Sequence, residues 1–278
     1  MSIQAHLSEA YDAASIVYYD LRVLVHTAVL EYVLLDPRAR VVAFKSFPNS
    51  ERSLLPTFLE TTRKQDPILR SEGFRSVACL TPGTSWLLLP NAHFHPDTGE
   101  HLLEQLCEYE TSFHSVRHSP VEQAGMHLSF ALDVDLEAAC RRVFAAGSVD
   151  HLLTELIRKG LRILKASGLP LFCWVHLTYD SFTYLIYKRD QLLFCNQYPM
   201  YAAEDVVYFV LRVNQALQLA TDEVSSLLTG NAPFTREIAT ALTGYFGGAI
   251  DLDQLYELRL PPELHAASCL HLLPEPVI

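Results

Sequence analysis

The sequence has little of what marks several common classes of protein. Its 278 residues include 21 Lys and Arg against 32 Asp and Glu, a formal net charge of -11, and no basic cluster. Proteins that bind nucleic acid or anionic membranes need such clusters to neutralise phosphates. The longest apolar runs, such as Leu171–Leu177 and Val206–Val213, fall far short of the roughly 20 residues that span a bilayer. We therefore expect neither a nucleic-acid partner nor a membrane partner.

Paired cysteines and a secretory signal are also missing. No Cys-x-x-Cys occurs, and most of the six cysteines sit inside apolar runs, so we expect buried free thiols. The opening MSIQAHLSEAYDAAS has neither a basic region nor an apolar core, as a signal peptide would. These features favour a cytoplasmic protein. The cysteines are Cys79, Cys107, Cys140, Cys173, Cys195 and Cys269.

What the sequence does have is 50% hydrophobic residues, arranged in short runs. Between Phe172 and Pro199 three apolar runs are broken at Tyr179-Asp180-Ser181 and at Lys188-Arg189-Asp190. Strands joined by tight turns produce this pattern. The segment therefore predicts a three-stranded meander.

A second meander is predicted near the N-terminus, from the runs Leu21–Val25, Val29–Leu35 and Val41–Phe47. Aligning Tyr32 with Tyr184 matches the middle strands, and a one-residue gap places Phe47-Pro48 on Tyr198-Pro199. The chain thus reads as an internal duplication.

Each meander is followed by a predicted helix and a fourth strand. The helices are Ser53–Lys64 and Ala202–Leu219, and the strands are Arg75–Leu80 and Val224–Leu228. The second helix carries an apolar stripe at one-face spacing, formed by Val206, Val210, Val213 and Leu217. We expect this stripe to pack on the second meander.

Two further helices are predicted between the repeats, Asp133–Phe144 and Asp150–Leu164, the latter with Asp150 as N-cap. Gly168-Leu169-Pro170 then punctuates the chain. We predict an N-terminal half over residues 1–168, with the additional helices, and a C-terminal half over residues 169–278.

This order of elements resembles the actin-like ATPase fold, an α/β fold of two ribonuclease-H-like half-domains with mixed sheets flanked by helices. The segments SWLLLPNAHFH, VFAAGSVDHLLTELI, YPMYAAEDVVYFVL and LLTGNAPFTREIATAL resemble a bacterial domain-of-unknown-function family with that fold. The resemblance spans almost the whole chain. It implies that any nucleotide, ATP with Mg, would lie between the halves.

The resemblance also implies where phosphates would be held, in one hairpin turn of each half, where glycine lets backbone N–H groups approach. The matching turns are Val25-His26-Thr27-Ala28 and Tyr179-Asp180-Ser181-Phe182, and neither contains glycine. Asp180-Ser181 is either a remnant of a phosphate turn or an ordinary turn pair.

The adenosine side of such a fold uses a Gly-Gly turn after the fourth strand of the second half. Here Gly230-Asn231 matches it, followed by a helix from about Thr235, its expected N-cap, to Phe246. Asp180, Ser181, Gly230 and Asn231 are therefore the cofactor-binding candidates, if a nucleotide binds at all.

Histidines offer one more candidate site. His93, His95 and His101 lie close together in sequence, but the polar residues between them indicate a loop without a complete ligand set. His114 and His118 have the i, i+4 spacing of a helix face, again without a third ligand. We expect no metal, and a metalloprotein stays the third alternative.

No residues of a known catalytic pattern stand out. The chain lacks a Gly-x-Ser-x-Gly elbow and a set of strand-centred carboxylates for paired metal ions. We therefore expect no catalytic residue and no cofactor: a pseudoenzyme that serves as an interaction module for an unknown protein partner. The alternative is an ATP-binding kinase or ATPase whose turns have replaced glycine.

Overall fold

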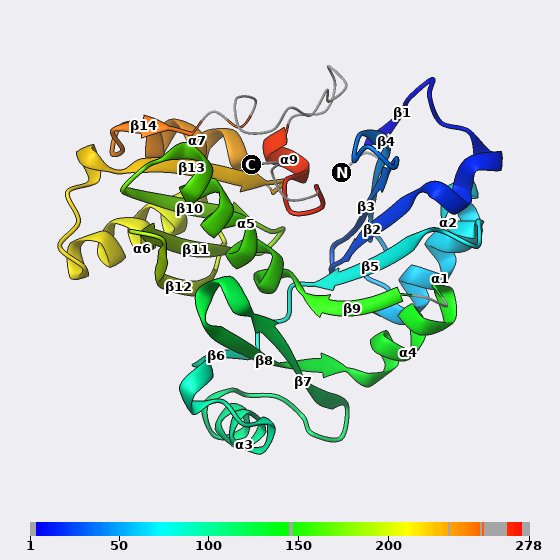
Figure 1. Ribbon diagram of the computed structural model, residues 1–278, viewed down its shortest axis with the longest axis horizontal. Coiled ribbons are helices and arrows are strands. Elements are labelled where there is room, and N and C mark those ends of the chain that lie inside the picture. The colour runs from blue at the N-terminus through cyan, green and yellow to red at the C-terminus, as the bar shows by residue number, and fades with distance from the viewer. Residues whose placement is uncertain (1–3, 145–146, 233, 251, 253–265, 274–278) are drawn as a thin grey trace. The chain divides into compact units, whose positions relative to one another are not determined.

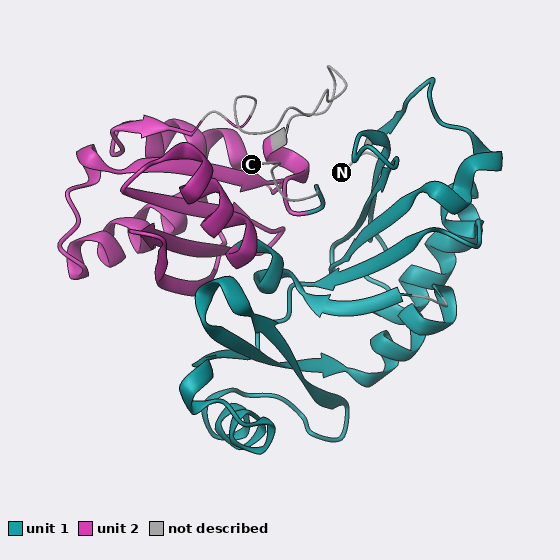
Figure 2. Cartoon of the chain, viewed as in Figure 1, with its two compact units in different colours: residues 1–156, 259–263, 272–274 teal, residues 157–258, 264–271, 275–278 magenta. Residues whose placement is uncertain are grey.

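A computed structural model of the chain describes residues 4–144, 147–232, 234–250, 252 and 266–273. Two compact units divide these residues (Figure 2). Unit 1 holds the residues up to Leu156 together with Leu272 and Leu273, and unit 2 holds the described residues from Ile157 to His271. Each unit has a mixed sheet flanked by helices (Figure 1).

The main sheet of unit 1 has the strand order β1-β4-β3-β2-β5-β9. Strands β2, β3 and β4 form the predicted antiparallel meander, while β5 lies parallel to β2 and β9 parallel to β5. The strands are β1 (Gln4–Leu7), β2 (Asp20–Val25), β3 (Val29–Leu35), β4 (Val41–Pro48), β5 (Ser76–Thr81) and β9 (Gly147–His151).

Helices pack on one face of this sheet and form an apolar core with its strands. Leu21, Val23 and Val25 of β2 join one core cluster with Leu59 of α1 and Leu136 of α4. The helical segments of this region are η1 (Ala13–Tyr18), α1 (Leu55–Gln65), α2 (Pro67–Arg70) and α4 (Val134–Val143).

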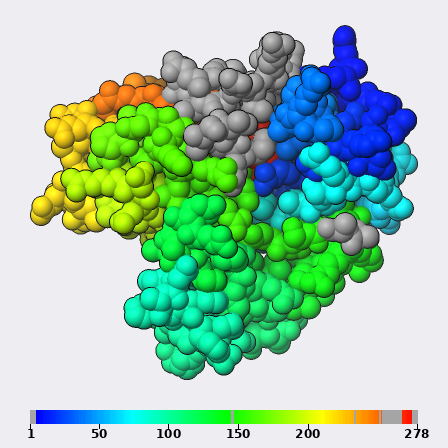
Figure 3. Space-filling model, in the orientation of Figure 1, coloured from blue at the N-terminus to red at the C-terminus, as the bar shows by residue number. Residues whose placement is uncertain are grey.

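Between β5 and α4 the chain forms an insertion, a three-stranded antiparallel sheet of order β6-β8-β7 with α3 beside it. Its elements are β6 (Trp86–Pro90), η2 (Asn91–His93), α3 (Pro96–Leu106), β7 (His114–Val121), η3 (Glu122–Ala124) and β8 (Met126–Asp133). In the space-filling view its cyan-to-green surface adjoins the green surface of α4 and β9 (Figure 3).

The sequence-based interpretation of this region was wrong in two respects. The residues around His101 form helix α3 rather than a loop, and His114 and His118 lie on strand β7 rather than on a helix. Spacing of i, i+4 also places two residues on one face of a strand, because side chains alternate with period 2. The two histidines alone could not distinguish the two conformations.

Unit 2 has a five-stranded sheet of order β12-β11-β10-β13-β14, again an antiparallel meander with a parallel strand beside it. Helices α6 and α7 cover one face. Its elements are β10 (Leu171–Leu177), β11 (Ser181–Lys188), β12 (Gln191–Pro199), α6 (Ala203–Ala216), η4 (Thr221–Glu223), β13 (Ser225–Gly230), α7 (Thr235–Thr243), β14 (Gly248–Ala249) and α9 (Ala266–Cys269), and α5 (Leu152–Ser167) leads into it from unit 1.

The predicted apolar stripe of α6 packs on the meander over most of its length. Val206 and Val210 are fully buried and Val213 packs against the same cluster. Leu217, the C-cap residue, is 36% exposed, because the helix ends at Ala216. The first three positions of the stripe are confirmed, and the fourth is wrong.

The main sheets of the two units have the same strand order and a register shift at the same place. Strand order β4-β3-β2-β5-β9 in unit 1 corresponds to β12-β11-β10-β13-β14 in unit 2. Each middle strand has one register shift, between Leu34 and Leu35 in β3 and between Ile186 and Tyr187 in β11. These shifts coincide when Tyr32 is aligned with Tyr184, which supports the predicted alignment.

Candidate functional site

The turn between β2 and β3 is closed by its own hydrogen bonds. His26 and Val29 exchange backbone bonds of 2.9 and 3.2 Å, and the His26 Nδ1 accepts from the backbone N–H of Ala28 at 3.1 Å. Asn49 donates to the carbonyls of Thr27 and Ala28. Three of the four N–H groups in residues 26–29 are therefore used inside the protein.

The corresponding turn of unit 2 joins β10 to β11 and is fixed by side chains. The Thr178 Oγ1 lies 2.7 Å from the Ser181 Oγ and donates to the Ser181 carbonyl at 2.9 Å, while Gln197 donates to the Ser181 Oγ. Met200 donates its N–H to the Asp180 carbonyl, as Asn49 does to Ala28 in unit 1. Ser181 is thus a buried structural hydroxyl, and Asp180 is exposed at the tip.

Gly230 lies at the end of β13, paired with Leu177 at the end of β10. Its φ is +92°, and an added Cβ would lie 2.0 Å from the Leu177 carbonyl oxygen. Both facts require glycine for backbone reasons. The structure thus brings the Asp180-Ser181 turn and Gly230-Asn231 to the same end of two parallel strands, the edge where α/β sheets commonly bind ligands.

A buried polar network lies just behind Gly230. The Trp174 Nε1 donates to the Thr229 Oγ1 at 2.7 Å, and that oxygen lies 2.8 Å from the His176 Nδ1. Burial, with the charges of His271 and Lys159, lowers the pKa of His176 well below its usual value. The Thr229 hydroxyl thus joins the Trp174 and His176 side chains in one buried hydrogen-bonded network.

The predicted histidine candidates do not converge. His95 accepts from the N–H of Asp97 as the N-cap of α3, and the Nε2 of His101 lies 3.0 Å from Gln105. His118 faces Phe94 and the Ser129 hydroxyl instead. Across the described residues, no group of three or more His, Cys, Asp or Glu is placed to hold a metal ion.

At the start of α5 the structure corrects the predicted cap. Helix α5 begins at Leu152, and the His151 Nδ1 accepts from the N–H of Leu153 at 3.1 Å. Asp150 lies one residue earlier and accepts from Ser119 at 2.6 Å, from the N–H of His151 at 2.7 Å and from the Thr154 hydroxyl at 3.3 Å. Thr235, the other predicted cap, is the first residue of α7 rather than its N-cap, which is Phe234. In both places the helix boundary is displaced by one or two residues.

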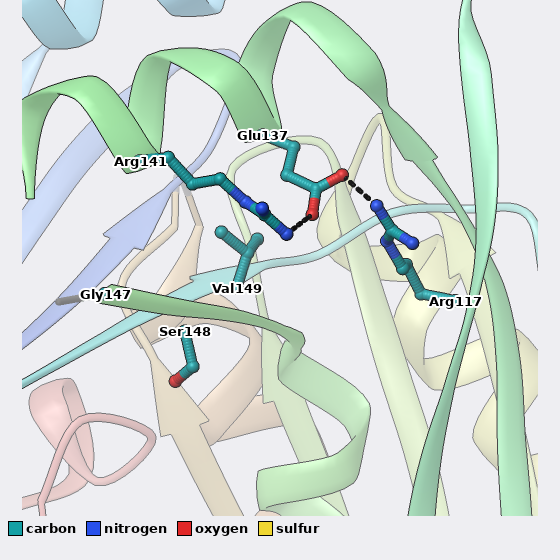
Figure 4. Close-up of a pocket in the computed structure, with 6 residues that line it drawn as sticks. All are labelled: Arg117, Glu137, Arg141, Gly147, Ser148 and Val149. Atoms are coloured by element: carbon teal, nitrogen blue, oxygen red, sulfur yellow. Dashed lines mark hydrogen bonds and ion pairs between the residues drawn. The ribbon is translucent and has the colours of Figure 1, made fainter. Parts of the chain in front are cut away.

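Unit 1 has a cavity of about 470 Å³ that was not predicted from the sequence. It is bounded by α4, β7 and β9 (Figure 4). Glu137 of α4 accepts from Arg117 of β7 at 2.6 Å and from Arg141 of α4 at 2.7 Å. The residues that line it are Arg117, Glu137, Arg141, Gly147, Ser148 and Val149.

The two arginines hold the central carboxylate ionised. Burial opposes the charge of Glu137, but hydrogen bonds and charges from Arg117 and Arg141 outweigh it, so the pKa of Glu137 lies below its usual value. Its side chain is 11% exposed, against 44% for Arg117 and 68% for Arg141. The cluster therefore presents two accessible cations on a buried anion. The only local signal in the sequence was the i, i+4 spacing of Glu137 and Arg141.

Comparison with solved structures identifies the fold. A protein of Bacteroides thetaiotaomicron with an actin-like ATPase fold and unknown function superposes with a TM-score of 0.76 at 15% identity, over 86% of this chain and 92% of that one. The PilM–PilN type IV pilus biogenesis complex superposes with a TM-score of 0.56 at 11% identity, over 91% of this chain and 96% of that one. These similarities show that the chain has the predicted actin-like ATPase fold.

Curated proteins offer no match to the chain. A family described as a protein of unknown function, DUF3822, matches residues 8–247 and so covers all the described strands except β1 and β14. The sequence-based resemblance to a domain-of-unknown-function family is confirmed. The chain belongs to the DUF3822 family.

Proposed function

We propose that this protein is a non-catalytic interaction module that binds a protein partner and uses neither ATP nor magnesium. The observation that carries the proposal is the hydrogen bonding of the β2–β3 turn. There His26 and Val29 accept hydrogen bonds from three of the four backbone N–H groups of residues 26–29. A triphosphate needs several backbone donors at close range, with a divalent ion and a basic group.

Charge supports the same conclusion. Asp180 lies at the tip of the second turn, where its carboxylate would repel a phosphate, and the chain carries a net charge of -11. The same acidity is the reason that we propose a protein partner rather than nucleic acid or an anionic membrane.

We further propose that the protein acts in the cytoplasm. All six cysteines are free thiols, as expected in a reducing compartment. In the part of the chain that the structure describes, no helix is long and apolar enough to cross a membrane.

Titration calorimetry with Mg-ATP tests the proposal. We expect heats no larger than those of dilution. Micromolar binding would contradict it, above all if Asp180→Ala changed the affinity while Glu204→Ala, which alters an exposed carboxylate on α6, did not. Gly230 must be left unchanged, because any side chain there would collide with the backbone of Leu177.

An ATP-binding kinase or ATPase is the second candidate. One observation favours it: the Asp180-Ser181 turn and Gly230-Asn231 lie at the same end of β10 and β13. The calorimetric titration separates the two candidates, because only this one requires saturable heats with Mg-ATP.

A further inference from the structure

The cavity beside Arg117 meets β9 at the edge of the strand. It is lined by three consecutive residues, Gly147, Ser148 and Val149. Successive side chains of a strand point to opposite faces, as Ser148 and Val149 do in Figure 4. A cavity that touches all three therefore runs along the backbone rather than over one face.

Both strands beside the cavity are the outermost strands of their sheets. Among the described strands, β9 ends the main sheet of unit 1, and β7 ends the three-stranded sheet. The Ser119 hydroxyl of β7 donates to the Asp150 carboxylate of β9 at 2.6 Å and joins the two strands at one end. An outer strand presents N–H and C=O groups that can pair with an added strand.

The charge beside this edge differs from that of three other ion pairs in unit 1. Elsewhere in unit 1, Arg40–Asp36, Arg75–Asp20 and Arg142–Glu60 each pair one cation with one carboxylate. Arg117 and Arg141 share the single carboxylate of Glu137. The cluster has a net charge of +1 from these three side chains, in a protein whose net charge is -11.

The geometry also leaves donors for a ligand. A guanidinium has five N–H donors, and Arg117 and Arg141 each use one of them on Glu137. No other hydrogen bond of either side chain occurs among the described residues. Glu137 holds the two guanidinium groups in place, so a second carboxylate could be received without reorganisation.

We propose that this groove binds an extended acidic segment of a protein partner, whose main chain pairs with the outer edge of β9 and whose carboxylate is held by Arg117 and Arg141. The inference rests on the proposed function and names the chemistry of its partner. A peptide fits better than a free anion because the outer edge of β9 also offers backbone groups beside the two arginines that another main chain can pair with. The pairing must centre on Val149, because the N–H groups of Gly147 and His151 already donate to the Phe144 carbonyl and the Asp150 carboxylate.

A library of random dodecapeptides displayed on phage provides the test. We expect the wild-type protein to enrich peptides in which an Asp or Glu is flanked by alternating apolar residues. The double variant R117Q/R141Q should lose at least about tenfold in affinity for the recovered peptide, measured by fluorescence anisotropy. R142Q is the matched control, because Arg142 follows Arg141 on α4 and pairs with Glu60.

N-methylation of the recovered peptide tests the main-chain pairing. Methyl groups on one alternating set of amides should abolish binding, and those on the other set should leave it unchanged, because only every second N–H faces the strand. Equal effects of the two sets would overturn strand pairing. No enrichment, peptides without an acidic residue, or equal binding by R117Q/R141Q would overturn the site.

The outcome is separable from that of the proposed function. Mg-ATP binding together with Arg-dependent peptide binding would refute the non-catalytic proposal and leave the groove supported. If the protein bound neither Mg-ATP nor a peptide, the proposed peptide site would be refuted. The non-catalytic proposal would then stand without an assigned binding surface.

Discussion

Tyr32 of β3 and Tyr184 of β11 occupy equivalent places in the two sheets and make equivalent bonds. Each is fully buried and lies two residues before the register shift of its strand. The Tyr32 hydroxyl donates to the Asp66 carboxylate at 3.2 Å, and the Tyr184 hydroxyl donates to the Asn214 side-chain oxygen at 2.7 Å. Each bond ties the middle strand to the helical layer of its unit.

The two tyrosines differ in how many other hydrogen bonds their acceptor side chains make. Asp66 also accepts from Ile68, Leu69 and Lys45, whereas the Asn214 side chain has no further hydrogen-bond partner among the described residues. We therefore expect Tyr184→Phe to lower the free energy of unfolding by about 1–2 kcal/mol, and Tyr32→Phe by less than about 1 kcal/mol. Urea denaturation measures both, with the exposed Tyr201→Phe as control. A larger loss for Tyr32→Phe would contradict this assignment of roles.

Much of the fold could be predicted because its core strands are strongly apolar. All seven residues of β3 are buried, and seven of the eight in β11, so both meanders stood out in the sequence. The insertion was missed for the opposite reason. Strand β7 reads HSVRHSPV and has one buried residue, so no apolar alternation marks it.

The candidate site was harder to predict than the fold. Arg117 and Glu137 lie twenty positions apart and meet only because β7 pairs with β8 and α4 follows β8. Asp180 and Gly230 could be proposed as candidates because turns and glycines are visible locally in a sequence. Only the structure shows that position 230 requires glycine because a side chain there would collide with the Leu177 backbone.

Gly160 provides a test of the packing between α5 and the sheet of unit 2. An added Cβ would lie 2.0 Å from the ring of Tyr187, which is fully buried and stacks on Phe172 at 4.8 Å. We expect Gly160→Ala to cost about 3 kcal/mol or more, because the methyl group would overlap a fully buried ring.

Gly244→Ala is the control for this substitution, since its nearest neighbour would be 3.9 Å away. Thermal and urea melts should show no loss for it. Combining Gly160→Ala with Tyr187→Leu should recover part of the stability. A Gly160→Ala protein as stable as the wild type would show that α5 does not lie on Tyr187.

His151 should make stability depend on pH. Burial lowers the pKa of His151 to about 4, although its hydrogen bond with the Gly83 carbonyl opposes the shift. The unfolded chain therefore binds a proton below about pH 6.5 that the folded protein refuses. Stability is full above that pH and falls by at most about 3 kcal/mol as the pH drops to 4.

His151→Asn isolates this contribution, because asparagine keeps an acceptor for the N–H of Leu153 but does not titrate. The difference in urea midpoint between variant and wild type should narrow as the pH falls through this range. Parallel curves for the two proteins would show that His151 is not buried in its neutral form.

Glu137 should also make the protein less stable as the pH falls, in this case because a stabilising carboxylate becomes protonated. Its pKa is lowered, so its contribution is present above its unfolded value of about 4.5 and is lost as the pH falls through the folded value. We expect Glu137→Gln to cost about 1 kcal/mol at neutral pH and nothing in acid. Urea melts across this range check it, and an equal cost at every pH would contradict the ion cluster.

We propose above all that an actin-like fold here binds a partner without turning over nucleotide. Phosphate release from millimolar Mg-ATP by the purified protein tests it most directly. We expect a rate indistinguishable from that of buffer, for the wild type and for Asp180→Ala alike. A steady rate that Asp180→Ala abolishes and Glu204→Ala preserves would contradict it.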